Sequence, residues 1–237
     1  MYLGLIDNYL VKIQETTDHT SSFYKENGAK NLEAVVGDLF LAGSESTSFT
    51  LSFATLYLIL NKNVQRNAQE ELDRVIGPSC QVSLRDKPSL PYTEAVILET
   101  LRLSSIAPLG FPHRLLVDTM FHGYHLPKDV TVMAGLYTIH HDPKIWGEDA
   151  NEFQPERFLN ENKTRVIHHE ALMAFSTGRR VCLGEGLARD TSFLFIASIL
   201  QRFNIGPDPE YPVTKIETLA GFAVEPKPFK FVLSLRN

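Results

Sequence analysis

A single cysteine in a loop rich in glycine and arginine is the most reactive group that the sequence offers. Cys182 lies in FSTGRRVCLGEG, where two arginines precede it and glycines on both sides allow close backbone approach. Gly184 opens a predicted helix whose N-terminal amides face the sulfur. Cations and a helix N-terminus both stabilise a thiolate, which is a nucleophile or a metal ligand. The alternative interpretation of Cys182 is a small buried hydrophobic residue.

The sequence gives less support to two other functions of this loop, a nucleophilic cysteine and a phosphate site. A nucleophilic cysteine needs a base, and the sequence does not indicate which of the eight histidines would approach Cys182. The segment GEGLA suggests a phosphate cradle, but it lacks the G-x-G-x-x-G spacing and no strand clearly precedes it.

Two other polar patterns lie on predicted helices. Glu99 and Arg102 are three residues apart and therefore share one helix face, although a surface ion pair explains them equally well. The run AGSEST, residues 42–47, places small residues and hydroxyls inside a long apolar helix. This run indicates either close helix packing or a widened groove that holds a small ligand beside an acid.

Paired histidines raise a third possibility, a metal site at His140-His141-Asp142 or His168-His169-Glu170. Adjacent side chains in a strand or helix point apart, so such pairs are poor ligands for one ion. The sequence therefore argues against this site.

The composition describes an ordinary packed globule. The chain has 237 residues, 43% of them hydrophobic, with a formal net charge of −5, which argues against nucleic acid as the main partner. Two cysteines are too few for a disulfide framework. All 13 prolines lie at Pro78 or later, so long helices are expected before it and many turns after it.

Hydrophobic spacing predicts the elements that must position these residues. We expect a helix in residues 1–15, and a long one from an Asn31 N-cap to about Leu60. Asp38, Glu45 and the hydroxyl residues interrupt this apolar run, so a buried central helix explains it better than a membrane span. Further helices are expected in NVQRNAQEELDRVIG, in residues 91–103 and in GLARDTSFLFIASILQRF.

The remaining elements are short. GYHLPKDVTVMAG predicts two strands that pair around a Pro-Lys-Asp turn, an irregular aromatic-rich stretch follows over 142–158, and PFKFVLSLRN resembles a strand. The fold class is mainly α with minor β, in which small hairpins and a cysteine loop accompany a long central helix. No signal peptide is visible at the start of the chain.

Four segments together resemble the cytochrome P450 family of haem-thiolate monooxygenases, most closely the animal microsomal type. FSTGRRVCLG matches the pattern F-x-x-G-x-R-x-C-x-G at every fixed position, and ETLR, residues 99–102, matches E-x-x-R. FQPERF contains Arg157, which would complete a lock with Glu99 and Arg102. AGSEST lies where the family carries its oxygen-activating segment, and DLFLAGSEST and GFPHR point to the animal type.

The resemblance implies a haem b group, iron protoporphyrin IX, with Cys182 as the axial ligand of the iron. Arg180 and His113 would bind the haem propionates, Phe175 would shield the thiolate side of the ring, and Gly184 belongs to the same loop. The protein would position and tune the group, which performs the oxygen chemistry.

On the opposite side of the haem, the resemblance implies that Ala42 and Gly43 open the helix to admit O2. Glu45 and the hydroxyls of Ser46 and Thr47 would relay protons. The family places threonine directly after the acid, where this chain has Ser46. Serine keeps the hydroxyl but loses the methyl that limits its rotamers, so we expect retained activity with altered coupling.

The implied activity is insertion of one oxygen atom of O2 into a lipophilic substrate, with electrons from NADPH through an FAD- and FMN-containing reductase. The candidate substrate contacts are largely apolar, and each could equally belong to a core: Phe40, Ile106, Leu109, Phe111, Leu219 and Phe222. The family resemblance also implies a place on the cytoplasmic face of the endoplasmic reticulum membrane.

The chains of the family are much longer than this one. The resemblance therefore implies that residues 1–237 are the C-terminal part of a single cytochrome P450 domain, without the N-terminal half and its membrane anchor. The alternative function is a non-catalytic fragment that does not hold haem productively.

Overall fold

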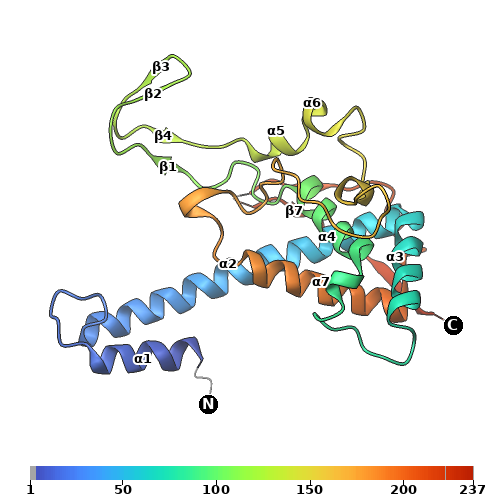
Figure 1. Ribbon diagram of the computed structural model, residues 1–237, viewed down its shortest axis with the longest axis horizontal. Helices are drawn as coiled ribbons and strands as arrows, with labels where there is room; N and C mark the ends of the chain where they lie inside the picture. The colour runs from blue at the N-terminus through green and yellow to red at the C-terminus, as the bar shows by residue number, and fades with distance from the viewer. Residues whose placement is uncertain (1–3, 222, 237) are drawn as a thin grey trace. The chain divides into compact units, whose positions relative to one another are not determined.

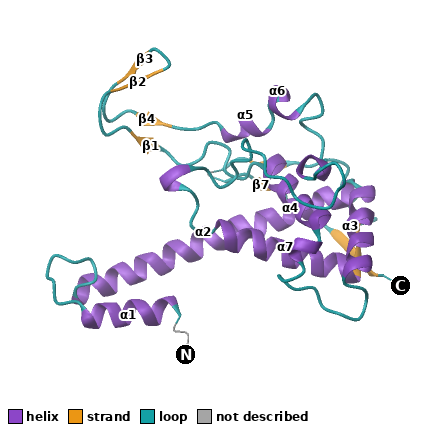
Figure 2. Cartoon of the chain, in the orientation of Figure 1, coloured by secondary structure: helices purple, strands orange, loops and turns teal. Residues whose placement is uncertain are grey.

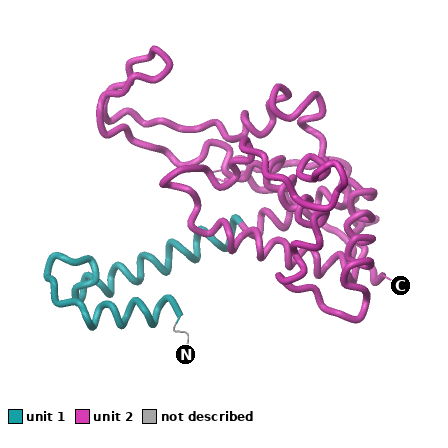
Figure 3. Tube along the Cα trace, in the orientation of Figure 1, with its two compact units in different colours: residues 1–46 teal, residues 47–237 magenta. Residues whose placement is uncertain are grey.

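A computed structural model describes residues 4–221 and 223–236, in which helices dominate (Figures 1 and 2). The strands in these ranges form four antiparallel pairs of two strands each. This arrangement confirms the prediction of a mainly α fold with minor β structure. The chain divides into two compact units, Met1–Ser46 and Thr47–Asn237, and the division lies inside one long helix (Figure 3).

The first unit contains the predicted N-terminal helix, α1 (Leu5–Glu15), and the beginning of α2 (Lys25–Leu60). Gly28 is needed where the two meet, because an added Cβ would lie 2.5 Å from the carbonyl oxygen of Phe23 and 2.7 Å from Cγ1 of Ile13. The rings of Tyr9 and Phe23 also pack together there, with their centroids 4.8 Å apart. A side chain at position 28 would therefore push this contact apart.

Helix α2 differs from the predicted one in two ways. It begins at Lys25, so Asn31 is no N-cap but lies inside the helix, where its side-chain amide donates to the carbonyl of Ser22. Apart from Gly28, the buried residues of the helix lie in its last third, mainly 53–59, whereas residues 37–45 are exposed. The apolar run alone could not show this, because burial depends on which elements pack beside the helix.

The core of the second unit lies between the end of α2 and three further helices. These are α3 (Lys62–Val75), α4 (Pro91–Ser104) and α7 (Glu185–Arg202), which contact one another. All three agree with the predicted helices, and Gly77 follows α3 with a φ of 74°, the left-handed conformation that favours glycine. Completely buried apolar side chains fill the space between the helices: Leu58, Leu72, Leu90, Val96, Phe193 and Leu200.

The predicted hairpin is wrong in its pairing. Strand β3 (Tyr124–Leu126) pairs with β2 (Thr119–Phe121), and β4 (Thr131–Val132) pairs with β1 (His113–Arg114). The tight turn is His122-Gly123, where both residues have positive φ, as a two-residue hairpin turn requires. The Pro-Lys-Asp segment instead connects β3 to β4, and the Asp129 amide there donates to the carbonyl of Leu115.

The other strands lie near the C-terminus. The predicted final strand is confirmed as β8 (Phe231–Leu235), which pairs with β5 (Phe203–Pro207) directly after α7. A second pair joins β6 (Thr218–Leu219) to β7 (Glu225–Pro226). These pairs extend the core beyond the end of α7, where Ile205 is buried.

The stretch before the cysteine loop consists of very short helices. It contains α5 (Leu136–His140), α6 (Pro143–Trp146) and the 3-10 helix η2 (Pro155–Phe158), and a further 3-10 helix, η3 (Gly178–Arg180), lies in the cysteine loop itself. Among the residues that the structure describes, no helix combines the length and apolarity needed to cross a bilayer.

Candidate functional site

The cysteine loop is held by backbone hydrogen bonds. The Cys182 amide donates to the carbonyl of Phe175 at 2.9 Å, and the amide of Val181 donates to the carbonyl of Gly178 at 3.2 Å. Phe175 is half-buried and packs against the core, whereas Cys182 is exposed. The exposed position contradicts the alternative interpretation of Cys182 as a buried hydrophobic residue.

Helix α7 begins directly behind the sulfur. Gly184 is the N-cap of α7 and provides no side-chain hydrogen bond to the first turn. A Cβ added at Gly184 would lie 3.9 Å from Sγ of Cys182, so the helix N-terminus and the sulfur are close neighbours. A helix N-terminus carries partial positive charge, so the sulfur lies beside the positive end of α7. Arg180, on the loop before the cysteine, is exposed.

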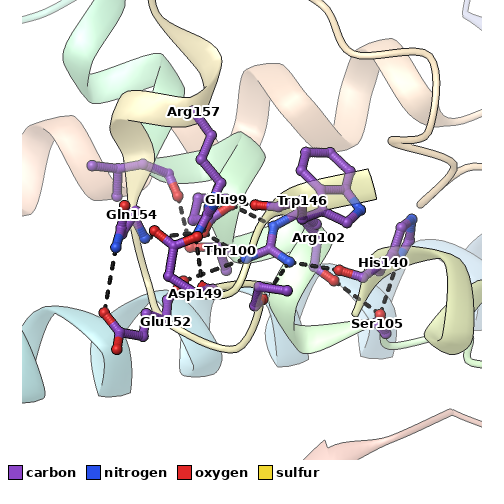
Figure 4. Close-up of polar contacts among 12 residues, drawn as sticks. Glu99, Thr100, Arg102, Ser105, His140, Trp146, Asp149, Glu152, Gln154 and Arg157 are labelled. Atoms are coloured by element: carbon purple, nitrogen blue, oxygen red, sulfur yellow. Dashed lines mark hydrogen bonds and ion pairs between the residues drawn. The ribbon is translucent and has the colours of Figure 1, made fainter. Parts of the chain in front are cut away.

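Glu99 and Arg102 form a completely buried ion pair on α4, not the surface pair that the sequence left possible. Nε and Nη2 of Arg102 donate to the two carboxylate oxygens of Glu99, each at 2.7 Å. Nη1 donates to the carbonyls of His140, at 2.5 Å, and Ala150, at 2.8 Å (Figure 4). The charge of Arg102 is therefore neutralised and hydrogen-bonded, which burial demands.

Arg157 approaches the same carboxylate from η2. Its Nε lies 3.4 Å from Oε1 of Glu99, and its terminal nitrogens donate to the backbone carbonyls of Trp146 and Asp149 (Figure 4). Burial raises the pKa of Glu99, while its hydrogen bond to Arg102 opposes that rise. The structure thus brings all three predicted lock residues together around one carboxylate.

The remaining predicted cofactor residues lie elsewhere. His113 is exposed on β1. Ala42, Gly43, Glu45 and Ser46 lie in the first unit, and Thr47 begins the second. The backbone of α2 stays helical through this segment instead of opening, and Oγ of Ser46 donates to the carbonyl of Ala42 at 2.7 Å.

The candidate substrate contacts occupy varied environments. Ile106 is half-buried and packs against the core, and its carbonyl accepts from the amide of Val224. Phe222 lies outside the described residues. The others are exposed: Phe40, Leu109, Phe111 and Leu219.

The donor chemistry decides which kind of metal group would fit. Within residues 4–221 and 223–236, no three His, Cys, Asp or Glu side chains cluster as metal ligands would, which speaks against both paired-histidine sites. Cys182 is thus a single soft donor. Zinc sites need three or four protein ligands, whereas haem supplies four nitrogens of its own and can be held by a single protein thiolate. The residues at the cysteine loop therefore fit haem.

Two polar residues of this region were missed by sequence reasoning. Glu71 on α3 is buried and binds the first turn of α4, and His140 is buried between α4 and the segment before the cysteine loop. In the sequence, Glu71 is one of several polar residues of an amphipathic helix, and His140 suggests only a metal ligand. No local pattern marks either residue, because their partners are distant in sequence.

Comparison with known proteins agrees with these motifs. The sequence model of the family "Cytochrome P450" matches residues 5–233. Cytochrome P450 2J5 of Mus musculus is 43% identical over 202 residues, which cover 85% of this chain and 39% of the relative. Cytochrome P450 2K1 of Oncorhynchus mykiss is 42% identical over 232 residues, 96% of this chain and 45% of the relative.

A third relative, cytochrome P450 2U1 of Bos taurus, is 37% identical over 233 residues, 98% of this chain and 42% of the relative. All three relatives come from animals, as the motifs predict. The chain spans about two fifths of their lengths, between 39% and 45%. Because the family match covers nearly the whole chain, this protein belongs to the cytochrome P450 family.

Proposed function

We propose that this chain carries the cysteine ligand and the proton-relay segment of a haem-dependent monooxygenase. The observation that carries the proposal is the exposed Cys182, whose backbone amide donates to the Phe175 carbonyl and whose sulfur lies next to the N-terminus of α7. Residues 1–237 would correspond to the C-terminal part of the family's domain. Haem, when bound, would supply the activation of O2 from which one oxygen atom enters the substrate.

Four side chains would hold the group. Sγ of Cys182 would bind the haem iron, and the helix dipole of α7 would stabilise the negative charge of the bound sulfur. Arg180 and His113 would donate hydrogen bonds to the propionates, and both side chains are exposed and therefore accessible to them. Phe175 would exclude water from the sulfur side.

Proton delivery would fall to the acid and hydroxyls of α2. Glu45 is exposed and could take a proton from water at its carboxylate. The Ser46 hydroxyl proton is held by the carbonyl of Ala42, so Ser46 would have to release that bond before passing the proton on. A serine Oγ rotates more freely than a threonine Oγ, which suits this exchange of partners.

The partners follow from the same chemistry. Electrons would come from NADPH through an FAD- and FMN-containing reductase, and the substrate would be a lipophilic organic molecule. We further propose an association with the endoplasmic reticulum membrane, on its cytoplasmic face.

Replacement of Cys182 tests the proposal. The chain is expressed with haem supply, reduced and exposed to CO, and its absorption spectrum is recorded. The wild type should show the red-shifted Soret band of a thiolate-bound ferrous–CO haem, because Cys182 would donate the thiolate. Cys182→Ala should abolish this band.

Cys80→Ala is the matched control, since Cys80 is also a free, exposed cysteine. It should keep the red-shifted band. An unchanged spectrum in Cys182→Ala would exclude Cys182 as the ligand. A wild-type chain that gives no such band would refute the proposal for residues 1–237 and favour the non-catalytic alternative.

A further inference from the structure

His140, the last residue of α5, is completely buried and contacts three residues in two other segments of the chain, the end of α4 and the segment before the cysteine loop. Its backbone carbonyl accepts from Arg102, its ring atom Nδ1 lies 2.8 Å from Oγ of Ser105, and its ring atom Nε2 lies 3.0 Å from the backbone nitrogen of Met173. Figure 4 shows the ring of His140 beside Ser105, with the guanidinium of Arg102 reaching the backbone of His140. A histidine thus joins the buried ion pair to the segment that leads to Cys182.

The hydrogen bonds define the tautomer of the ring. Because the Met173 amide can only donate, Nε2 must accept and the ring proton must sit on Nδ1. Nδ1–H then donates to Oγ of Ser105, whose own proton goes to the carbonyl of Arg102 at 2.9 Å. Both ring nitrogens therefore have a partner and a fixed direction.

The segment held by His140 also holds the cysteine. The carbonyl of Met173 accepts from the amide of Ser176 at 2.8 Å, which closes a turn around Phe175. The carbonyl of Phe175 accepts from the amide of Cys182 at 2.9 Å. A displacement of Met173 would therefore move the acceptor that fixes the backbone of Cys182.

The surroundings keep the ring neutral. Burial, with smaller contributions from the nearby charges of His141 and Arg102, lowers the pKa of His140 to about 4. A protonated ring would turn Nε2 into a donor facing the donor of Met173. The neutral ring is consequently the form that can hold this segment near physiological pH.

We infer that His140 is a positioning residue for the cysteine loop, because its Nε2 accepts the Met173 amide and so registers residues 173–182 against the Glu99–Arg102 pair of α4. The inference rests on the proposed role of Cys182 as haem ligand. His140 itself touches no reacting atom, and acts through the backbone of Met173 and Phe175.

Two substitutions separate this role from simple core packing. In His140→Gln, the amide oxygen can replace Nε2 as the acceptor for Met173, while the donor to Ser105 is lost. In His140→Asn, the amide nitrogen can replace Nδ1–H as the donor to Ser105, while Met173 loses its acceptor. The two variants are similar in polarity and differ in which bond they keep.

Amide hydrogen exchange of the full chain without haem is the first measurement. In His140→Asn, the Met173 and Cys182 amides should exchange about tenfold faster or more, as expected for a buried donor that has lost its acceptor. Core amides of α3 should change much less. In His140→Gln, the Met173 and Cys182 amides should keep wild-type rates.

Faster exchange at Met173 and Cys182 in His140→Gln would overturn the inference. This variant tests the inference even if His140→Asn does not fold. Equal acceleration of all core amides in both variants would also overturn it, because that is the signature of packing alone.

The spectrum of the reduced, CO-bound protein is the second measurement. His140→Asn should lose most of the red-shifted band and His140→Gln should retain it. A wild type without the band would refute the proposed haem function, while the exchange rates would still decide whether His140 holds the loop.

Discussion

Arg102 is the largest completely buried side chain among the described residues, and its environment shows how a charge is accommodated in a core. Every terminal nitrogen of its guanidinium has an acceptor, either on Glu99 or on a backbone carbonyl. The ring of Trp146 lies over it, 4.9 Å from centroid to Cζ. Arg102 thus fixes the orientation of the backbone carbonyls of His140 and Ala150, because removal of either would leave a buried donor unpaired.

The buried ring of His140 should make stability depend on pH. Its pKa is about 4 in the folded chain against 6.5 for an exposed histidine, so between these values the unfolded chain binds a proton that the folded chain does not. The free energy of unfolding should therefore fall as pH drops from about 6.5 to about 4, by about 3 kcal/mol in total. His141, whose pKa burial also lowers, acts in the same direction.

Urea denaturation of the wild type and His140→Gln near neutral pH and at about pH 5 measures this effect. The wild type should lose about 2 kcal/mol more than the variant over this range. An identical loss in both proteins would contradict the predicted pKa of His140.

At the scale of elements, α4 is capped by a side chain from another helix. Leu90, its N-cap, provides no side-chain hydrogen bond, and the carboxylate of Glu71 on α3 accepts from the Tyr92 and Thr93 amides instead, each at 2.8 Å. The hydroxyl of Thr93 donates to the same group. The helix that carries Glu99 and Arg102 is thereby joined to α3 at its start.

Glu71→Ala should lower the free energy of unfolding by about 3 kcal/mol, because buried amides would lose a charged acceptor. Glu70→Ala is the control, since Glu70 is exposed and its ion pair with Arg66, at 3.9 Å, should contribute about 0.5 kcal/mol or less. Urea denaturation measures both, and equal losses would show that Glu71 is not a helix cap.

At the scale of the whole molecule, large apolar side chains are exposed on several elements. Phe195 on α7 is 54% exposed and borders an apolar hollow that it shares with Leu194, Ile199 and residues 81–85. Exposed apolar patches promote self-association. We therefore expect these apolar surfaces to promote self-association of the chain.

Phe195→Lys should reduce self-association in sedimentation velocity while changing the free energy of unfolding by about 0.5 kcal/mol or less, as is usual for surface substitutions. Ser79→Lys changes the net charge equally at an exposed polar position and should leave self-association unchanged. If both variants reduce association alike, charge and not the apolar surface controls it.

The long helices and the family were predictable because their signals are local. Helix α3 ends where Gly77 and Pro78 interrupt the periodicity, and the cysteine pattern is contiguous in sequence. The sequence predicts the wrong strand pairing because Pro-Lys-Asp and His-Gly are both turn signals. In addition, β1 and β4 pair with each other although the β2–β3 hairpin separates them in sequence. The sequence predicts that α2 starts at Asn31 because asparagine is a good capping residue. In the structure the helix begins at Lys25, and the Asn31 side chain donates to the carbonyl of Ser22.

The family, the mainly α class and the residues of the cysteine loop could all be predicted from the sequence, because each depends on the order of neighbouring residues. The folded structure was needed to show that Glu99 and Arg102 are buried and not a surface pair, and that Arg157 approaches the same carboxylate. It also decided that His140 binds Met173, 33 positions further along the chain. Contacts of this kind arise when distant segments pack together, and burial then requires every polar group to find a partner.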